Sequence, residues 1–355
     1  MNPYLAVVVL VCTVSLLLML PLLPALVELR RKSDALPLSV VQQNAGEIRH
    51  FANSFRDYIK GLEPIMQGCV AAGTSATGTL PDGEEYVVLG QFDDSLIGAL
   101  LRRDATHPVV IAAGADLIAP PHATFSRDIY AGAKFQGGEK NNYRAILGEK
   151  DVHLGASSRV MRWVHAVGEF KADLGCSLIG RVSSDSLIRL HSDCSFLRLN
   201  APRIKVGPAV NREQGLPDSG LLSNAGVLPR FLHDGDFEVH AGQIMSSNMV
   251  IRGRLLLRSG ARICGSVKSL DDMVLEDDVS VEGSLIGARK LSIGPHCTIH
   301  GPVVAERELS IATGTRCGTW EHPTTVSAPS IEVEEGVLVF GTLWARERGQ
   351  VVATS

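Results

Sequence analysis

The chain repeats itself every 18 residues between Met249 and Ala345, and small apolar residues carry the repeat. Four sets of residues one period apart line up as Leu255, Met273, Leu291 and Leu309; Leu257, Leu275, Ile293 and Ile311; Ile263, Val281, Ile299 and Cys317; and Met249, Val267, Leu285 and Val303. Within a period the apolar positions stand two residues apart, which indicates β-strands rather than a helix with its period of about 3.6. A repeat of this length is typical of a solenoid, in which each turn buries its side chains on the turns above and below. We therefore predict a mainly β protein with a β-solenoid over residues 237–345 and a tail over 346–355.

The same period occurs in weaker form nearer the N-terminus. The columns one period apart there are Val152, Phe170 and Ile188, and Val160, Leu178 and Phe196. They predict a first solenoid segment over residues 109–207. Residues 208–236 lie between the two segments and are rich in Gly, Pro, Asn and Asp, which favours a loop or linker.

An apolar run opens the chain. Residues 4–29 are mostly Leu and Val and include one charged side chain, Glu28. At about 1.5 Å per residue, a helix of this length crosses roughly 30 Å of hydrocarbon, so we predict a transmembrane helix. Arg30, Arg31 and Lys32 follow at once, and such positive residues are retained on the cytoplasmic side. We expect a single pass, with the N-terminus outside, the solenoid in the cytoplasm and the lipid bilayer as one partner.

An amphipathic helix is predicted for residues 39–66. Ser39 to Gln42 has the pattern of a capping box. The apolar positions that then share one helical face are Val41, Ile48, Phe51, Phe55, Ile59 and Leu62. We expect this helix to pack on the open end of the solenoid or on another copy, or to lie on the bilayer. Residues 67–108 are predicted to be a linker and a small mixed segment.

Composition excludes several functions. The chain has 34 basic and 38 acidic residues and a net charge of −4, so it has no basic field for nucleic acid. Its seven cysteines include no C-x-x-C pair, so neither a disulfide framework nor a zinc site is indicated. We therefore expect no metal, no cofactor and no nucleic-acid partner.

The best-formed repeats resemble those of a known family. Residues Val281–Ala288 followed by Leu291–Ile293 recur one period later as Ile299–Glu306 followed by Leu309–Ile311. Over residues 249–345 this pattern is similar to that of the bactofilins, polymer-forming cytoskeletal proteins of bacteria. The resemblance implies a right-handed parallel β-helix.

The resemblance implies a polymer-forming scaffold, and together with the predicted transmembrane helix it leads us to expect a membrane-anchored one at the bacterial cell envelope. Its first partner is expected to be itself, as a homo-oligomer or polymer. Envelope-biosynthesis or polysaccharide-building proteins are expected as further partners, and the expected location is the inner membrane.

An enzyme remains the alternative. An 18-residue turn also equals three hexapeptides, and Ile293–Thr298 fits the hexapeptide repeat of acyltransferases that act on a sugar or sugar nucleotide. His296 or His300 would then be the general base. Hexapeptide phasing fails in the neighbouring turns, so the scaffold is the preferred interpretation.

A partner face is predicted on the outside of the coil. Residues next to inward positions point outward, so Ile286, Val304 and Trp344 should form one external column with Phe340 beside it. Because few residues follow Ala345, the last turn should be an open end where apolar residues meet a second copy or another partner.

Overall fold

The structure is a computed structural model that describes residues 9–10, 13–15, 19–20, 48–90, 101–207 and 228–353. Among these residues, no helix has the length and apolar character needed to cross a membrane. Most of the predicted span at 4–29 lies outside the described residues, as do Arg30, Arg31 and Lys32. The beginning of the predicted amphipathic helix and most of the predicted linker 208–236 lie outside them too.

Two helices and a short 3₁₀ turn precede the first solenoid. They are α3 (His50–Ile59), η3 (Lys60–Leu62) and α4 (Glu63–Ala72). The amphipathic helix is therefore confirmed from His50 onward, but helical structure continues to Ala72, beyond its predicted end. Gly73 ends α4 in the left-handed conformation, at φ 64°, which a residue without a Cβ adopts at little cost. The first part of the region predicted as a linker is thus a helix followed by the hairpin strand β1 (Ser75–Thr79).

The first solenoid, solenoid 1, begins earlier than predicted, because β2 already pairs in parallel with β4. Its strands are β2 (Glu85–Leu89), β3 (Thr106–His107), β4 (Val110–Ala113), β5 (Leu117–Ile118), β6 (Thr124–Ala131), β7 (Phe135–Gln136), β8 (Asn142–Gly148), β9 (Val152–Leu154), β10 (Arg159–Ala166), β11 (Phe170–Ala172), β12 (Ser177–Ser184), β13 (Leu187–Leu190) and β14 (Ser195–Val206).

The second solenoid, solenoid 2, begins at Arg230 rather than 237. Its strands are β15 (Arg230–His233), β16 (Phe237–Val239), β17 (Ile244–Met245), β18 (Asn248–Ile251), β19 (Leu255–Leu257), β20 (Arg262–Ile263), β21 (Val267–Ser269), β22 (Met273–Leu275), β23 (Ser280–Val281), β24 (Leu285–Gly287), β25 (Lys290–Ile293), β26 (Thr298–Ile299), β27 (Val303–Ala305), β28 (Glu308–Ile311), β29 (Arg316–Cys317), β30 (Thr324–Glu334) and β31 (Leu338–Val352).

The predicted 18-residue columns are the rungs of a parallel β-solenoid with about 13 turns in all. Leu255 pairs with Met273, Met273 with Leu291, and Leu291 with Leu309. These four side chains are at most 2 % exposed. Apolar side chains at every second position, mostly Val, Ile, Leu and Ala with some Phe, fill the interior, so the core is a narrow stack that runs through the coil.

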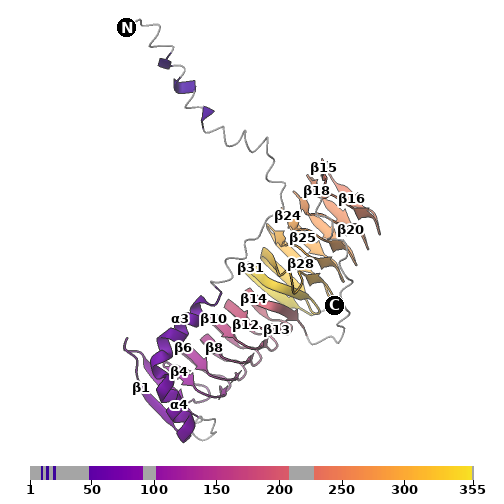
Figure 1. Ribbon diagram of the computed structural model, residues 1–355. Coiled ribbons are helices and arrows are strands. Elements are labelled where there is room, and N and C mark those ends of the chain that lie inside the picture. Colours follow the sequence, from indigo (N-terminus) through magenta and orange to yellow (C-terminus); the bar gives the residue numbers. More distant parts are fainter. Residues whose placement is uncertain are drawn as a thin grey trace. The chain divides into compact units, whose positions relative to one another are not determined.

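The last turns of the two solenoids pair with each other (Figure 1). β14 runs antiparallel to β31, with Leu199 opposite Leu343 and Ile204 opposite Val339. The residues predicted as a tail are part of β31, which continues to Val352 between β14 and β30. The C-terminal turn is therefore closed within the chain, which corrects the prediction of an open end there.

The helices lie along the outside of solenoid 1, and α3 contacts β10 while α4 contacts β1 and β2 (Figure 1). Their apolar side chains cover outward-facing residues of successive rungs, among them Val88, Ala112, Leu147 and Trp163. The Phe55 ring meets the edge of Trp163 at 5.7 Å between centroids. Because these sheet positions are apolar on the outside, they require a cover, and the helices supply it along one face rather than at an end of the solenoid.

We predict that Gly349→Val destabilises the pairing of the two solenoids. A Cβ at Gly349 would overlap the ring of Phe196 and its backbone oxygen. Overpacking of this kind lowers the free energy of unfolding by about 1–3 kcal/mol, and thermal melting followed by circular dichroism measures it. Gly68→Ala is the matched control, since no atom lies within 4 Å of a Cβ there. A Gly349→Val variant as stable as the unmodified chain would contradict this pairing.

We also predict that Phe55→Ala loosens the helices from solenoid 1. Trp163 is 6 % exposed, whereas Trp320 and Trp344 are 63 % and 39 % exposed. Loss of the Phe55 ring should therefore admit water to the one buried indole and shift its fluorescence emission to longer wavelength. The exposed neighbour Ser54, changed to Ala, should leave the emission spectrum unchanged. Equal spectra for both variants would show that the helix does not cover Trp163 in solution.

Candidate functional site

One row of outward-facing residues crosses from solenoid 1 to solenoid 2, and we call it the outer column. Successive rungs contribute Trp163, Arg181, Arg198, Trp344, Ser327, Val304 and Ile286. The predicted alignment of Ile286, Val304 and Trp344 on the outside is therefore confirmed, with Ser327 between Val304 and Trp344. Sequence reasoning missed that the row continues into solenoid 1, because no 18-residue spacing spans an antiparallel junction.

Near the junction, two arginine side chains of the outer column stack on aromatic rings. The guanidinium of Arg198 lies 5.1 Å from the centroid of Trp344, and that of Arg181 lies 5.2 Å from the ring of Phe51 in α3. Such contacts attract the cation to the ring face. Phe340, in contrast, is only 8 % exposed. Its predicted place on the partner face is wrong, because β14 and β30 enclose β31 and the last turn is interior.

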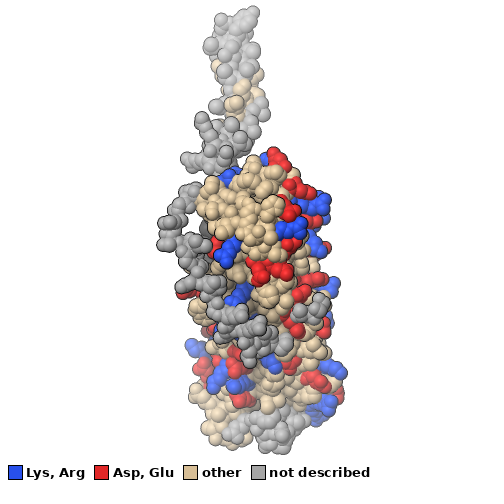
Figure 2. Space-filling view, turned by 90° about the vertical axis from the view of Figure 1, so that its right-hand side faces the viewer, with Lys and Arg blue, Asp and Glu red and all other residues tan. Residues whose placement is uncertain are grey.

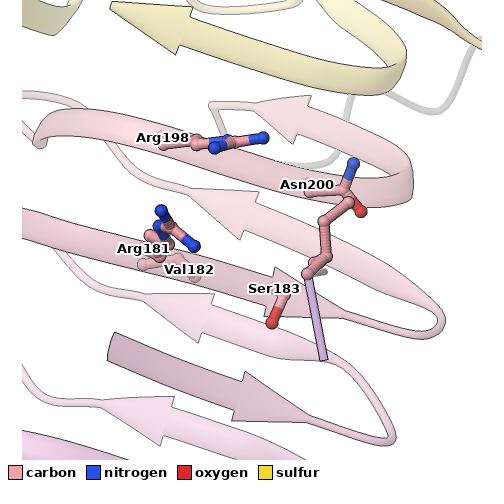
Figure 3. A pocket seen from close by; sticks show the side chains of 6 residues that line it. Arg181, Val182, Ser183, Arg198 and Asn200 are labelled. Carbon is pink, nitrogen blue, oxygen red and sulfur yellow. The ribbon is translucent and has the colours of Figure 1, made fainter. Parts of the chain in front are cut away.

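A hollow of about 20 Å³ lies where the described helical segment begins (Figure 3). It is lined by Ile48, Arg181, Val182, Ser183, Arg198 and Asn200. Asn200 donates a hydrogen bond to the Thr342 hydroxyl across the junction, at 2.7 Å. The space holds little more than one water molecule. It lies at the first described residue of the helical segment and is too small to be a ligand site.

His165 lies beneath the helical cover of solenoid 1 and is 2 % exposed. Its Nδ1 is 2.9 Å from the Ser183 hydroxyl, and its buried Nε2 is 3.8 Å from Asp185 Oδ2. Asp185 also pairs with Arg49 at 2.7 Å, next to the start of α3. Burial lowers the pKa of His165, although the charge of Asp185 opposes this. The imidazole is therefore neutral at pH 7, and Asp185 is left to hold the helix through Arg49.

A larger hollow, of about 480 Å³, lies on another face of solenoid 1. Its polar lining consists of Asp116, Lys134, Gln136, Asp151, His153, Glu169 and Lys171. His153 Nε2 lies 2.8 Å from Asp173 on the next rung, and Lys171 Nζ, on the same rung as Asp173, lies 3.0 Å from it. Burial alone would raise the pKa of Asp173, but hydrogen bonds from Lys171 and His153 outweigh it and hold that pKa below its ordinary value. The hollow is thus lined by ion pairs, some of which, such as Lys134 with Asp151, join neighbouring rungs.

The two candidate catalytic histidines occupy different environments. His296 sits at a corner with φ 59°, and its ring fills the space that a Cβ at Gly314 would need. His300 Nδ1 lies 3.1 Å from Glu282 Oε2, at ion-pair distance but without hydrogen-bond alignment. Sequence reasoning missed this carboxylate, although Glu282 and His300 are one period apart and hence stacked. Both histidines serve packing between rungs, and neither lines the two hollows described above.

The six described cysteines are free thiols, and five of them are buried. Burial raises the pKa of Cys297 and that of Cys317 to about 12. Such thiols remain protonated at pH 7 and are poor nucleophiles and metal ligands. Within the described ranges, no group of three or more His, Cys, Asp or Glu side chains is placed to hold a metal ion.

Among the described residues, the first rung of solenoid 2 has an unpaired strand edge. β15, β16 and β17 pair with β18, β19 and β20, and no described strand pairs with their other edge. Phe231, Phe237 and Met245 close the core there but are only partly buried. Leu232 and Ile244 are 49 % and 62 % exposed. The prediction put the apolar end of solenoid 2 at its last turn, whereas the structure has partly exposed apolar residues at its first turn.

Comparison with known proteins gives no relative: no family model matches the chain, and neither a curated protein nor a solved structure is significantly similar to it.

Proposed function

We propose that the protein is a self-associating, membrane-anchored scaffold of the bacterial cell envelope. The observation that carries this proposal is the open first rung of solenoid 2. Backbone N–H and C=O groups on an unpaired strand edge readily pair with another chain. Here such an edge borders partly buried aromatic residues, Phe231 and Phe237, whose rings are 5.0 Å apart. An edge of this kind gains both hydrogen bonds and apolar burial when it is covered.

A second copy of the same chain is the occupant that fits best. β14 and β31 already illustrate how two rungs of this protein join edge to edge in antiparallel register. Two copies of β15 related by a two-fold axis would meet in the same way. One such contact closes a pair, so a longer polymer needs a second contact elsewhere on the chain.

The anchor and the resemblance supply the rest of the proposal. Residues 4–29 would cross the inner membrane, and Arg30, Arg31 and Lys32 would keep the solenoids in the cytoplasm. The similarity of residues 249–345 to bactofilins favours a right-handed coil and a role in positioning polysaccharide-building or other envelope proteins. An acyltransferase is less favoured, since His296 packs on a neighbouring rung and Nδ1 of His300 is buried beside Glu282.

Placing a charge at the open rung should weaken self-association. We expect Phe237→Asp to lower the association constant at least tenfold, because the carboxylate would have to lose water at a dry contact. Sedimentation velocity of the full chain in detergent measures this effect, and far-UV circular dichroism verifies that the fold is intact.

Leu174→Asp is the control for that variant, since Leu174 is 53 % exposed at a corner of solenoid 1. It should sediment like the unmodified chain. Self-association at this edge is disproved if Phe237→Asp retains its β signal and assembles normally, or if the unmodified chain is monomeric at every concentration.

The orientation in the membrane is tested separately. Fused after Ser355, a reporter that works only in the cytoplasm should be active, and one that works only in the periplasm should be inactive. Replacement of Arg30, Arg31 and Lys32 by neutral residues should weaken that orientation. Substituting Arg346 and Arg348, two basic residues far along the chain, should not change it. A fusion active in the periplasm would refute the cytoplasmic placement.

A further inference from the structure

His165 is an ionisable residue enclosed at the contact between solenoid 1 and its helical cover. Val164 and Ala166, its neighbours in β10, belong to the interior core, so the side chain of His165 points outward. An outward position on a strand normally faces water, yet this side chain is buried. Leu147, its partner on the preceding rung, lies in the cluster that α3 and α4 cover. The imidazole is therefore enclosed because the helices lie over it.

Two ion pairs attach the start of the cover to the rungs on either side of His165. Arg49, immediately before α3, pairs with Asp185 at 2.7 Å, and Arg56 of α3 pairs with Glu149 at 2.6 Å. Glu149 and Asp185 directly follow β8 and β12, the two strands that flank β10. All four charged groups act on the imidazole, two of each sign.

The enclosed imidazole is poorly suited to carry a charge. Its Nδ1 lies 2.9 Å from the Ser183 hydroxyl, whereas Nε2 is buried and has no hydrogen-bond partner among the described residues. Asp185 Oδ2 is 3.8 Å from Nε2, beyond hydrogen-bond distance, and Oδ1 of the same carboxylate is held by Arg49. A buried cation without a bonded counter-ion costs free energy. Burial accordingly lowers the pKa of His165 below its ordinary value, although the charge of Asp185 opposes this.

Charges on the outer surface are in a different situation, because water solvates them. Figure 2 shows acidic and basic side chains next to one another along one face of the molecule. If α3 moves away from solenoid 1, His165 gains the same access to water. An exposed imidazole titrates near its ordinary pKa of about 6.5. The state with α3 displaced therefore binds a proton more readily than the covered state.

We propose that His165 is a proton-sensitive switch that releases α3 from solenoid 1 as the pH falls. Because the displaced state takes up the proton, the contribution of His165 to the cover is complete above about pH 6.5 and is lost as the pH falls toward the lower pKa of the covered state. Uptake of one proton weakens the cover by at most about tenfold per pH unit. The switch lies within solenoid 1 and depends neither on self-association nor on a membrane anchor.

Trp163 reports the release, because Phe55 of α3 covers its ring. The other two tryptophans, Trp320 and Trp344, are replaced by Phe, so that all indole emission comes from Trp163. This single-tryptophan chain, full length and in detergent, is titrated from about pH 8 to about pH 5, the range in which histidine changes its charge. Emission should shift to longer wavelength below about pH 6.5 and return when the pH is raised. Far-UV circular dichroism should stay constant.

Two substitutions at His165 and one control assign the response. His165→Leu should abolish the shift, because Leu takes up no proton and repeats the apolar side chain that Leu147 places on the preceding rung. His165→Gln should abolish it too, and it keeps a hydrogen-bonding group beside Ser183 in case Leu disturbs the fold. His50→Gln is the matched control, since His50 is an exposed histidine of α3 itself. This variant should respond to pH like the single-tryptophan chain.

Three outcomes overturn the proposal. The first is an emission spectrum that does not change over this pH range, or one that shifts to shorter wavelength, which would mean that the imidazolium pairs with Asp185 and tightens the cover. The second is a shift that persists in both His165 variants. The third is a loss of β signal together with the shift, because the solenoid itself would then be unfolding.

Discussion

The antiparallel pairing of β14 with β31 determines how the rest of the molecule is arranged. A β-solenoid ends in an unpaired strand edge and an exposed cross-section of core, and each end has to be covered. Here the last turns of the two solenoids cover each other, with Leu199 against Leu343. Two of the four ends are thereby removed within one chain. The β1 hairpin pairs with the starting edge of β2, whereas no described strand pairs with the starting edges of β15, β16 and β17 in solenoid 2.

The same junction gives the chain an approximate two-fold arrangement with unequal halves. Solenoid 1 has its outer apolar row covered by α3 and α4, whereas solenoid 2 leaves the corresponding row, with Ile286 and Val304, partly exposed. Ion pairs such as Arg189 with Glu169 occupy another outer face and stabilise neighbouring rungs there.

The sequence predicted the fold well where the structure is periodic. Inward columns such as Leu255, Met273 and Leu291 follow directly from the 18-residue spacing, because each rung must bury side chains on the next. The junction could not be predicted this way, since antiparallel pairing brings together Arg198 and Trp344 without any common period. For that reason the open end was assigned to the wrong turn and Phe340 to the surface. The contact of His300 with Glu282 could have been predicted, because the two residues are one period apart and therefore lie on neighbouring rungs.

Hydrogen exchange tests the central claim most directly: solenoid 2 is closed at its last turn and open at its first. Exchange of backbone amides, measured by mass spectrometry on the full chain, should show β31 protected at every protein concentration. The peptides that contain β15, β16 and β17 should be protected only when the concentration allows self-association. Rapid exchange throughout β31, or slow exchange of β15 to β17 in the isolated monomer, would contradict the account.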